Sequence, residues 1–479
     1  MLDFAPLIGS PTRFRASQVL LAVCWIILCL IGSATQTQAA GWKAGVAKAD
    51  ITPDKPMWMS GYASRDHRAT GTRTKLWGKV LILEDARGKR VAAITLDLVG
   101  LDQATSNAMR DQIVKEHGLE RSGIALLCSH THCGPVVGNN LMSMYTLTEE
   151  DQTLVREYTS GLINEVVTAV GQALSDLTPA ELTWSSGKTG FAVNRRTNKE
   201  AEVPTLRANK ELLGPSDHEV PVLQVSSGDH IKAIVFGYAC HATTLSFFEW
   251  CGDYPGFAMQ QIEEDYPSTQ AMFWAGCGAD QNPLPRRTVE LAQEYGSRLA
   301  TEVETALISN ATPISGDLDV RYEETELAFA TIPTAEQVEA QLTSTNVYEA
   351  GRAKALKKEL QTHGSIRPTY TYPVQTWQLG DGPVWVILGG EVVVDYSIRL
   401  KTEIRMHHGP KPVWVAGYAN DVMAYIPSLR VLKEGGYEGE GAMLYYGLPS
   451  KWAESVEDQI VGTVHAQVKS LRESKPPVK

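Results

Sequence analysis

Three apolar runs in this chain each end in a short turn that carries a metal-ligating side chain. Residues 123–127 lead to Ser129-His130-Thr131-His132-Cys133-Gly134-Pro135, residues 231–236 lead to His241, and residues 384–388 lead through two glycines to Glu391. Runs of this length and composition are typical of buried strands. An α/β enzyme holds a metal in turns of this kind, so the recurrence constrains the fold and indicates a metal site.

The ligand types in these turns are those of a hydrolytic zinc centre. A His-x-His pair alone is a weak signal, because eleven histidines in 479 residues produce one by chance in roughly one such chain in four. Two histidines and one carboxylate, with a position left for water, form the ligand set of a zinc hydrolase. We therefore predict that His130, His241 and Glu391 hold one zinc ion. The sequence contains no Cys-x-x-Cys pair, which disfavours a cysteine site.

Strand-like and helix-like stretches alternate from Gly45 to about Ser470, without a linker rich in Pro, Ser or Gly. This alternation predicts an α/β fold with a single large catalytic domain, in which mixed β-sheets are flanked by helices. The predicted strands are 79–84, 91–96, 124–127, 231–236, 272–275, 384–388 and 413–416. The predicted helices are 103–117, 149–175, 289–308, 335–361 and about 451–471. The glycine-rich stretch 435–441 predicts a loop.

The first forty residues have the pattern of a secretory signal. Arg13 and Arg15 precede an apolar stretch from Val19 to Ile31, and small or polar residues follow up to Ala39 and Ala40. The apolar stretch is short for a membrane span. We therefore favour export, to the periplasm or outside the cell, after cleavage near Ala39 or Ala40, over a retained membrane anchor.

Three segments follow from this pattern. We predict a signal peptide over 1–40, the catalytic domain over 41–472 and a disordered tail over 473–479. The net charge of -11 argues against a nucleic-acid partner, because nucleic-acid binding normally needs a basic face. Five cysteines follow the signal: Cys128, Cys133, Cys240, Cys251 and Cys277. An odd number leaves at least one without a partner in the chain, and a Cys240–Cys251 bridge is one pairing left open.

Further segments carry a resemblance to a known family. They are Gly45-Val-Ala-Lys-Ala-Asp-Ile-Thr-Pro53, Met59-Ser-Gly-Tyr-Ala63, the His-Thr-His motif, Val193-Asn194-Arg195, the His241 segment, Gly390-Glu391, and the two tyrosines Tyr425 and Tyr437. With these residues the chain resembles the N-terminal catalytic domain of the neutral/alkaline non-lysosomal ceramidases, over nearly its whole length after residue 40. The resemblance implies the fold of that domain.

The resemblance also implies a role for each matching residue. The implied ligands of one zinc ion per chain are His130, His241, Glu391 and Tyr425, and the implied catalytic residues are His132, Arg195, Tyr437 and Asn282. Zinc-bound water would attack the N-acyl amide bond of ceramide or a related N-acyl lipid, giving fatty acid and sphingoid base. Arg195 and Tyr437 would stabilise the oxyanion, and His132 would carry the proton to the leaving amine.

Two residues depart from the family pattern. In Gly278-Ala-Asp-Gln-Asn-Pro283, Asn282 stands where the family has a serine that is a candidate nucleophile. Asparagine cannot attack an amide, but a zinc-bound water needs no side-chain nucleophile. Cys133 replaces a second serine and adds a thiol close to the metal.

Alternative interpretations of the same residues stay open. The chain could be a non-catalytic lipid- or glycan-binding relative that keeps the fold, or an amidase or esterase for a different substrate. The expected partner is a small, lipid-like N-acyl amine, with peripheral membrane contact compatible with the sequence and no indication of oligomeric state. Arg196 is an alternative to Arg195 as the substrate contact. Asp97 and Asp253 each either orient a ligand histidine or cap the end of a strand or helix.

Overall fold

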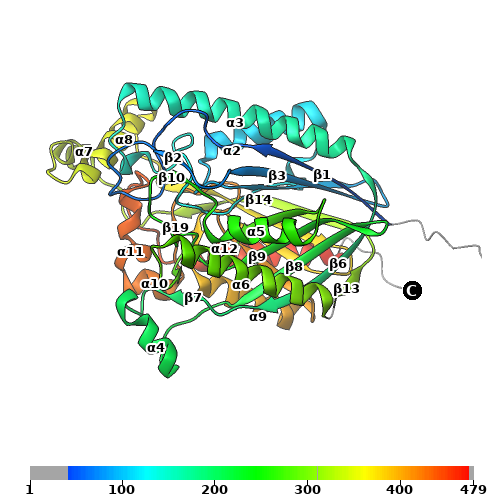
Figure 1. Cartoon of the computed structure of the whole chain (residues 1–479). Helices are drawn as coiled ribbons and strands as arrows, with labels where there is room; N and C mark the ends of the chain where they lie inside the picture. Colours follow the sequence, from blue (N-terminus) through cyan, green and yellow to red (C-terminus); the bar gives the residue numbers. More distant parts are fainter. Residues whose placement is uncertain (1–40, 310, 474–479) are drawn as a thin grey trace, which may run out of the picture. The chain divides into compact units, whose positions relative to one another are not determined.

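A long mixed sheet and a shorter second sheet form the framework of this protein, of which a computed structural model describes residues 41–309 and 311–473 (Figure 1). The long sheet has the order β11 (Gln270–Ala275), β9 (His230–Tyr238), β8 (Glu219–Ser227), β6 (Thr178–Lys188), β1 (Trp42–Asp50), β3 (Trp77–Asp85), β4 (Arg90–Leu96), β5 (Ile124–Cys128), with β13 (Thr312–Ile314) beside β6. The second sheet has the order β14 (Leu318–Ala328), β15 (Thr369–Leu379), β16 (Val384–Leu388), β18 (Val413–Ala416).

The two sheets pack face to face, and helices cover their outer faces, so the protein has four layers. Alternate residues of one strand enter different cores: Ile82 of β3 packs under the helices, whereas Leu83 packs between the sheets. Likewise Val386 of β16 faces the outer helices and Trp385 faces the inter-sheet core. This period of two is the pattern expected of strands with both faces buried. The prediction of an α/β fold with mixed sheets flanked by helices is confirmed.

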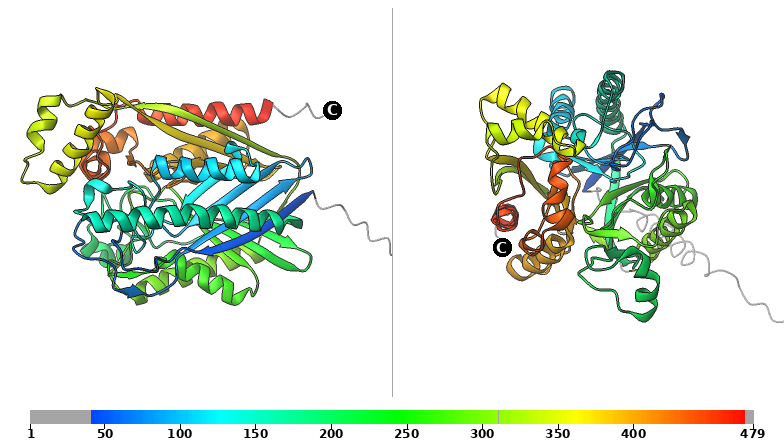
Figure 2. Two further views of the ribbon diagram at one scale, coloured as in Figure 1. Left: turned by 90° about the horizontal axis from the view of Figure 1, so that it is seen from above. Right: turned by 90° about the vertical axis from the view of Figure 1, so that its left-hand side faces the viewer.

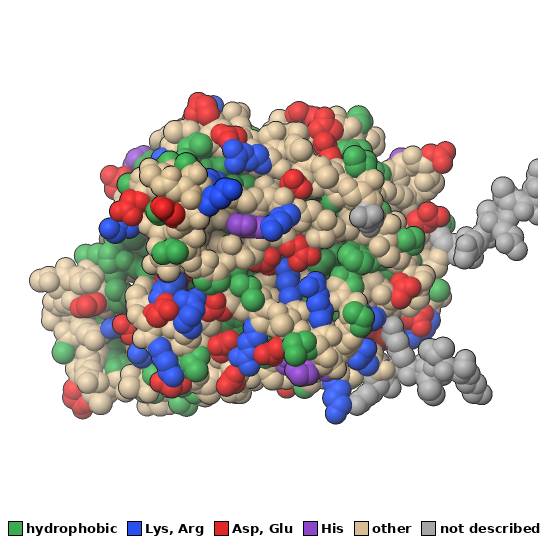
Figure 3. All heavy atoms as spheres, turned by 90° about the horizontal axis from the view of Figure 1, so that it is seen from below, with side chains coloured by type: hydrophobic (Ala, Val, Ile, Leu, Met, Phe, Trp, Pro, Cys, Tyr) green, Lys and Arg blue, Asp and Glu red, His purple; other side chains and the backbone are tan. Residues whose placement is uncertain are grey.

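The helices divide between the two outer faces (Figure 2). Those over the long sheet are α2 (Gln103–His117), α3 (Glu149–Ser175), α5 (Asp253–Asp265) and α6 (Val289–Ile308). Those over the second sheet are α9 (Val394–His408) and α12 (Val456–Glu473). Within 41–309 and 311–473, no helix has the length and apolarity needed to cross a membrane. On the face shown in Figure 3, acidic and basic side chains are interspersed.

Aromatic side chains fill the space between the sheets. Trp385 lies edge-on to Trp377 and Trp414, with ring centroids 5.7 and 5.8 Å apart. All three rings are almost fully buried. Edge-to-face contacts at these distances are a favoured geometry for aromatic pairs. The two Val-Trp-Val runs of β16 and β18 therefore form part of a common core, in which they pair in parallel.

Three predicted elements were wrong in their bounds or type. The helix predicted over 335–361 is two helices, α7 (Ala335–Gln341) and α8 (Val347–His363). The chain breaks between them because Asn346 caps α8 through its side chain and the preceding Thr-Ser-Thr segment favours turns over helix interior. The loop predicted over 435–441 contains a four-residue helix, α11 (Gly436–Gly439). The last helix begins at Val456 rather than near 451, and Glu473 is its final residue.

Short elements complete the end of the sheets where β5, β16 and β18 finish. The strand pairs are β2 (Gly71–Thr72) with β10 (Glu249–Trp250), β7 (Ala192–Asn194) with β12 (Gln281–Pro283), and β17 (Glu391–Val392) with β19 (Tyr425–Ile426). The short helices there are η2 (Met142–Met144), η3 (Glu200–Glu202), α4 (Val203–Asn209), α10 (Leu429–Glu434) and η4 (Gly441–Leu444). At the other end of β5, η1 (Arg121–Gly123) directly precedes the strand. The predicted signal peptide and residues 474–479 of the predicted tail lie outside the described residues.

Candidate metal centre

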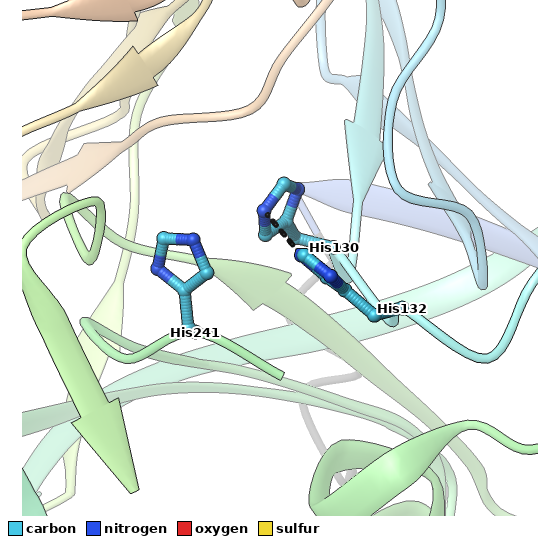
Figure 4. A group of neighbouring side chains, drawn as sticks. All are labelled: His130, His132 and His241. Atoms are coloured by element: carbon cyan, nitrogen blue, oxygen red, sulfur yellow. Dashed lines mark hydrogen bonds between the residues drawn. The ribbon is translucent and has the colours of Figure 1, made fainter. Parts of the chain in front are cut away.

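The three turns singled out in the sequence meet in the structure. His130 follows β5, His241 follows β9, and Glu391 begins β17 just after β16. Parallel pairing of β17 with β19 sets Glu391 directly beside Tyr425. Figure 4 shows His130 and His132 projecting from one turn toward His241 on another. All five side chains are buried.

The ligand atoms of these side chains cluster closely. Oε2 of Glu391 lies 3.2 Å from Nε2 of His130 and 3.2 Å from Nε2 of His241. The Tyr425 hydroxyl lies 3.3 Å from Nε2 of His241, and Nε2 of His132 lies 3.2 Å from Nε2 of His130. The ring nitrogens of the three histidines lie within 4.8 Å of one another, an arrangement that could hold a metal ion.

Outer hydrogen bonds fix which atoms face the centre. Nδ1 of His130 donates to the Val99 carbonyl at 2.6 Å, and Nδ1 of His241 donates to the Gly278 carbonyl at 2.7 Å. Each Nε2 therefore presents a lone pair inward, as in most protein sites where histidine binds a metal. The Tyr446 hydroxyl donates to Oε1 of Glu391. Oε2 of Glu391 is buried and has no hydrogen-bond partner among the described residues.

This geometry fits a bound cation with nitrogen and oxygen ligands. Three electron-rich atoms, from His130, His241 and Glu391, converge in a buried space and would repel one another without a positive charge between them. Neighbouring ligand atoms on a tetrahedral zinc ion with bonds of about 2.0–2.1 Å lie roughly 3.3 Å apart. The observed spacings of 3.2–3.3 Å agree with that value.

The electrostatics of the pocket favour the ligand forms of the side chains. Burial lowers the pKa of His241 to about 4 and, with the nearby charges of His130 and His241, holds the pKa of His132 well below its usual value. Burial alone would raise the pKa of Glu391, but the attraction of His130 and His241 outweighs it and holds that pKa well below the usual range. At neutral pH His132 and His241 therefore stay neutral and Glu391 stays a carboxylate.

Arg195 joins the metal centre to a neighbouring cavity. Its guanidinium donates to the Tyr425 hydroxyl at 3.0 Å, to Oδ1 of Asn282 at 3.3 Å and to Glu438 at 2.7 Å. The half-exposed Tyr437 ring lies 5.2 Å from the Tyr425 ring. His132, the fourth residue that the resemblance marked as catalytic, contacts none of the other three directly; its ring lies 5.9 Å from the His241 ring, and the Tyr425 hydroxyl lies 3.3 Å from Nε2 of His241.

The cavity beside Arg195 has a volume of about 500 Å³ and is lined mainly by charged side chains. Arg196 pairs with Glu438 and with Glu434, and Arg286 pairs with Glu200. Leu284 and Tyr437 are among its few apolar residues. A molecule that reaches the metal centre through this cavity must pass groups that favour polar contacts.

The structure gives other roles to the three residues considered as an alternative substrate contact or as partners of a ligand histidine: Arg196, Asp97 and Asp253. Arg196 does not contact Tyr425 in the structure, because Glu434, Glu438 and the Gly435 carbonyl occupy its guanidinium. Asp97 accepts the Trp77 amide at 2.9 Å, so it closes a strand end and orients no ligand histidine. Asp253 accepts the amides of Leu245 and Tyr254 at the start of α5.

The Cys240–Cys251 bridge is not present in the structure. All five cysteines in the described residues are buried thiols. The Cys251 amide donates to the Cys133 carbonyl, whereas the Cys240 carbonyl accepts the Tyr254 hydroxyl, so the two segments have other partners. Burial raises the pKa of Cys251 to about 12, which disfavours the thiolate that oxidation requires.

Three residues at the centre were missed in the sequence. They are Tyr446 against Glu391, Glu438 against Arg195, and Tyr418, whose ring lies 4.2 Å from the His130 ring and whose hydroxyl lies 3.3 Å from Nδ1 of His241. Tyr418 belongs to the segment Gly417-Tyr-Ala419 after β18, which repeats Gly237-Tyr-Ala239 at the end of β9, and this repeat was a signal that could have identified it. Nothing in the sequence around the other two distinguishes them.

We expect Tyr446→Phe to weaken metal binding by roughly 10- to 100-fold, the usual cost of losing an outer hydrogen bond to a metal ligand. The change removes the hydroxyl that orients Glu391 and leaves the ring in place. Competition with a chelating dye measures the affinity. The matched control is Tyr445→Phe, because Tyr445 packs against Tyr348 and Tyr437 rather than against Glu391. Equal affinities of both variants would refute the role of Tyr446.

Comparison with known proteins gives a family match for the first part of the described chain. Residues 42–278 match the family model described as neutral/alkaline non-lysosomal ceramidase, N-terminal. The neutral ceramidases of Drosophila pseudoobscura pseudoobscura and Drosophila melanogaster are each 28% identical over 111 residues, which is 22% of this chain and 15% of each relative. The aligned stretch thus spans about one seventh of the length of these relatives.

Two solved structures have a similar fold. The neutral ceramidase from Pseudomonas aeruginosa superimposes with a TM-score of 0.71 and 19% identity, covering 92% of this chain and 76% of that one. A ceramidase complexed with C2 gives a TM-score of 0.72 and 18% identity with the same coverage. At these identities the likeness shows the fold.

Proposed function

The chain belongs to the neutral/alkaline non-lysosomal ceramidase family through residues 42–278, and from this membership we propose that it is a zinc-dependent hydrolase of N-acyl amides. The substrate would be ceramide or a related N-acyl lipid, cleaved to fatty acid and sphingoid base. The observation that carries the proposal is the approach of Glu391 Oε2 to 3.2 Å from the inward nitrogens of His130 and His241.

His130, His241, Glu391 and Tyr425 would hold the zinc ion. Zinc bound there would lower the pKa of a water molecule and polarise the substrate carbonyl. Two features support a separate role for His132. Its Nδ1 is buried without a hydrogen-bond partner among the described residues, whereas the Nδ1 atoms of His130 and His241 are tied to backbone carbonyls. Its pKa is held well below the usual value, so the imidazole is unprotonated and keeps a free lone pair at neutral pH.

His132 would take a proton from the attacking water and deliver it to the amide nitrogen as the carbon–nitrogen bond breaks. Arg195 would donate to the oxyanion that forms on the carbonyl oxygen. Burial would lower the pKa of Arg195, but Tyr425 and Glu438 outweigh it and hold the pKa well above the usual value, so the group stays charged. A fixed charged donor in a buried site is an effective way to stabilise an oxyanion.

Asn282 would position Arg195 and the substrate. Its Oδ1 accepts from Arg195 at 3.3 Å and lies 3.5 Å from the Thr243 hydroxyl. An amide side chain provides no nucleophile, so this chain would depend on water for the attack. The replacement of the family's serine is compatible with turnover under that mechanism.

A second candidate function is hydrolysis of an N-acyl amine with a more polar group than ceramide. The cavity next to Arg195 supports it, because Arg–Glu pairs form a large part of its wall. Binding a long alkyl chain against such a wall would leave charged groups without water, which is unfavourable.

A substrate panel tests both proposals. The zinc-loaded protein is incubated with a short-chain ceramide, an N-acyl amino acid, the matching ester and a phosphodiester, and released fatty acid or phosphate is measured. We expect release from the amides and none from the phosphodiester. A preference for the N-acyl amino acid would identify the second candidate as correct. Cleavage of only the ester or the phosphodiester would refute the proposal that the protein hydrolyses amides.

A further inference from the structure

The cavity of about 500 Å³ beside Arg195 has more cationic than anionic side chains in its wall. The four cationic and three anionic residues are, in that order, Arg195, Arg196, Lys199 and Arg286, and Glu200, Glu434 and Glu438. Guanidinium groups remain charged across the whole neutral pH range. An anion that enters this cavity therefore meets a net positive charge.

Each of the three carboxylates is already shared between two cations. The sharing pairs are Arg195 and Arg196 on Glu438, Arg196 and Arg430 on Glu434, and Arg286 and Arg287 on Glu200. A carboxylate divided between two cations neutralises neither of them completely. The field inside the cavity should accordingly attract an anionic group and repel a second cation.

Arg286 is the cation of this wall that is best placed to receive an anion. Its Nε and Nη2 both donate to Oε2 of Glu200, at 3.0 and 2.9 Å. Its Nη1 makes no hydrogen bond within the described residues and is not fully buried, so a ligand can reach it. Two N–H donors of the guanidinium are therefore free for a ligand.

The ion pair between Arg286 and Glu200 is one that a competing carboxylate can open. The side chain of Glu200 is 41% exposed, whereas that of Arg286 is 14% exposed. An ion pair with such an exposed partner contributes little, because water screens it. Glu200 can move into the solvent while Arg286 stays in the wall, and the freed guanidinium can then bind a carboxylate through two parallel hydrogen bonds.

The same cavity reaches the edge of the candidate metal centre. Arg195 and Asn282 line it, and the Arg195 guanidinium donates to the Tyr425 hydroxyl at 3.0 Å. Arg286 follows Asn282 by four positions and lines the same space. A substrate whose amide lies at the metal centre can thus place an attached polar group beside Arg286.

We propose that this cavity binds a carboxylate on the amine part of the substrate, and that Arg286 is the residue that selects for it. The acyl part is an alkyl chain, which a charged wall does not favour, so the amine part occupies this cavity. The substrate class is then the N-acyl amino acids. This inference rests on the proposed amide hydrolysis and narrows its polar N-acyl amine to an anionic one.

Calorimetric titration of the zinc-loaded full chain with two matched ligands tests the proposal. The ligands are N-(octylsulfonyl)glycine and its neutral counterpart N-(octylsulfonyl)glycinamide. In both, a sulfonamide stands in the place of the amide, so neither is cleaved. We expect the carboxylate ligand to bind at least about tenfold more tightly, because a charged hydrogen bond contributes more than a neutral one.

Two variants should change this preference in opposite directions. In Arg286→Gln it should fall below about threefold, since the glutamine amide donates only neutral hydrogen bonds. In Glu200→Gln it should rise, because the carboxylate that competes for Arg286 is lost. If the pair served only to stabilise the fold, breaking it from either side would affect both ligands alike.

The matched control is Arg298→Gln, since Arg298 likewise pairs with one glutamate, Glu294, but lies outside this cavity. It should keep the preference of the unchanged protein. Equal binding of the two ligands by the unchanged protein would overturn the proposal. So would an undiminished preference in Arg286→Gln, or a reduced one in Glu200→Gln. Because neither ligand is cleaved, a failure of amide hydrolysis would count against the proposed function and leave this titration unaffected.

Discussion

His241→Ala should abolish metal binding and reduce fatty-acid release by about a thousandfold or more. The change removes one of the two ring nitrogens that lie 3.2 Å from Oε2 of Glu391. A catalytic metal contributes several kcal/mol to transition-state stabilisation, and each 1.36 kcal/mol is about a factor of ten in rate. Metal content by mass spectrometry and release from a short-chain amide measure the two effects.

The control for this variant is His230→Ala. His230 begins the same strand, β9, but is exposed at the opposite end. We expect it to keep its metal and its activity. If His241→Ala retained a full equivalent of metal, His241 would not be a ligand, and the proposed centre would be wrong.

Arg195→Met should lower kcat by roughly 100- to 1000-fold, the cost typical of losing one oxyanion donor. The guanidinium contacts Tyr425 and Asn282 at the edge of the metal centre, but it provides no metal ligand. Metal content should therefore be unchanged. Steady-state kinetics should place the loss mainly in kcat, because the interaction strengthens as the oxyanion forms.

Arg196→Met is the matched comparison, since both arginines pair with Glu438 and only Arg195 reaches Tyr425. We expect its kcat to fall by less than about tenfold, well below the effect of a lost oxyanion donor. A larger loss in Arg196→Met than in Arg195→Met would assign the substrate contact to Arg196 instead.

The parts of the fold that could be predicted are those with strong local signals. Helices α2, α3 and α6 have the predicted bounds because Asp102, Thr148 and Thr288 each cap the first turn through a side chain. Strands β5 and β16 could be predicted because each is an uninterrupted apolar run, and every residue in both is buried in the structure. These features depend on residues adjacent in the chain.

The antiparallel strands were harder to predict. Strand β14 includes three exposed glutamates, Glu323, Glu324 and Glu326, and β6 includes Ser185, Ser186 and Gly187, so neither has the composition of a strand. Their strand conformation comes from pairing with β15 and β8, which lie far along the chain. Tertiary pairing therefore overrode weak local preference.

The site residues likewise divide into those with a local sequence signal and those placed only by long-range contacts. His130, His241 and Glu391 were predicted because each follows an apolar strand, and the structure places them together. Tyr446 contacts Glu391 at a separation of 55 positions in the sequence, and Glu438 contacts Arg195 at a separation of 243. Contacts of that range depend on how loops pack after the sheets form, and the sequence around each residue holds no pattern for them.

The central claim is tested most directly by adding zinc back to metal-free protein. The chain is stripped with a chelator, zinc is titrated in, and fatty acid released from a short-chain amide is measured at each step. We predict that release is absent without zinc, rises in proportion to zinc and levels off at one equivalent per chain. Release that persists in the metal-free protein, or no release from any amide at a full equivalent of bound zinc, would contradict the account.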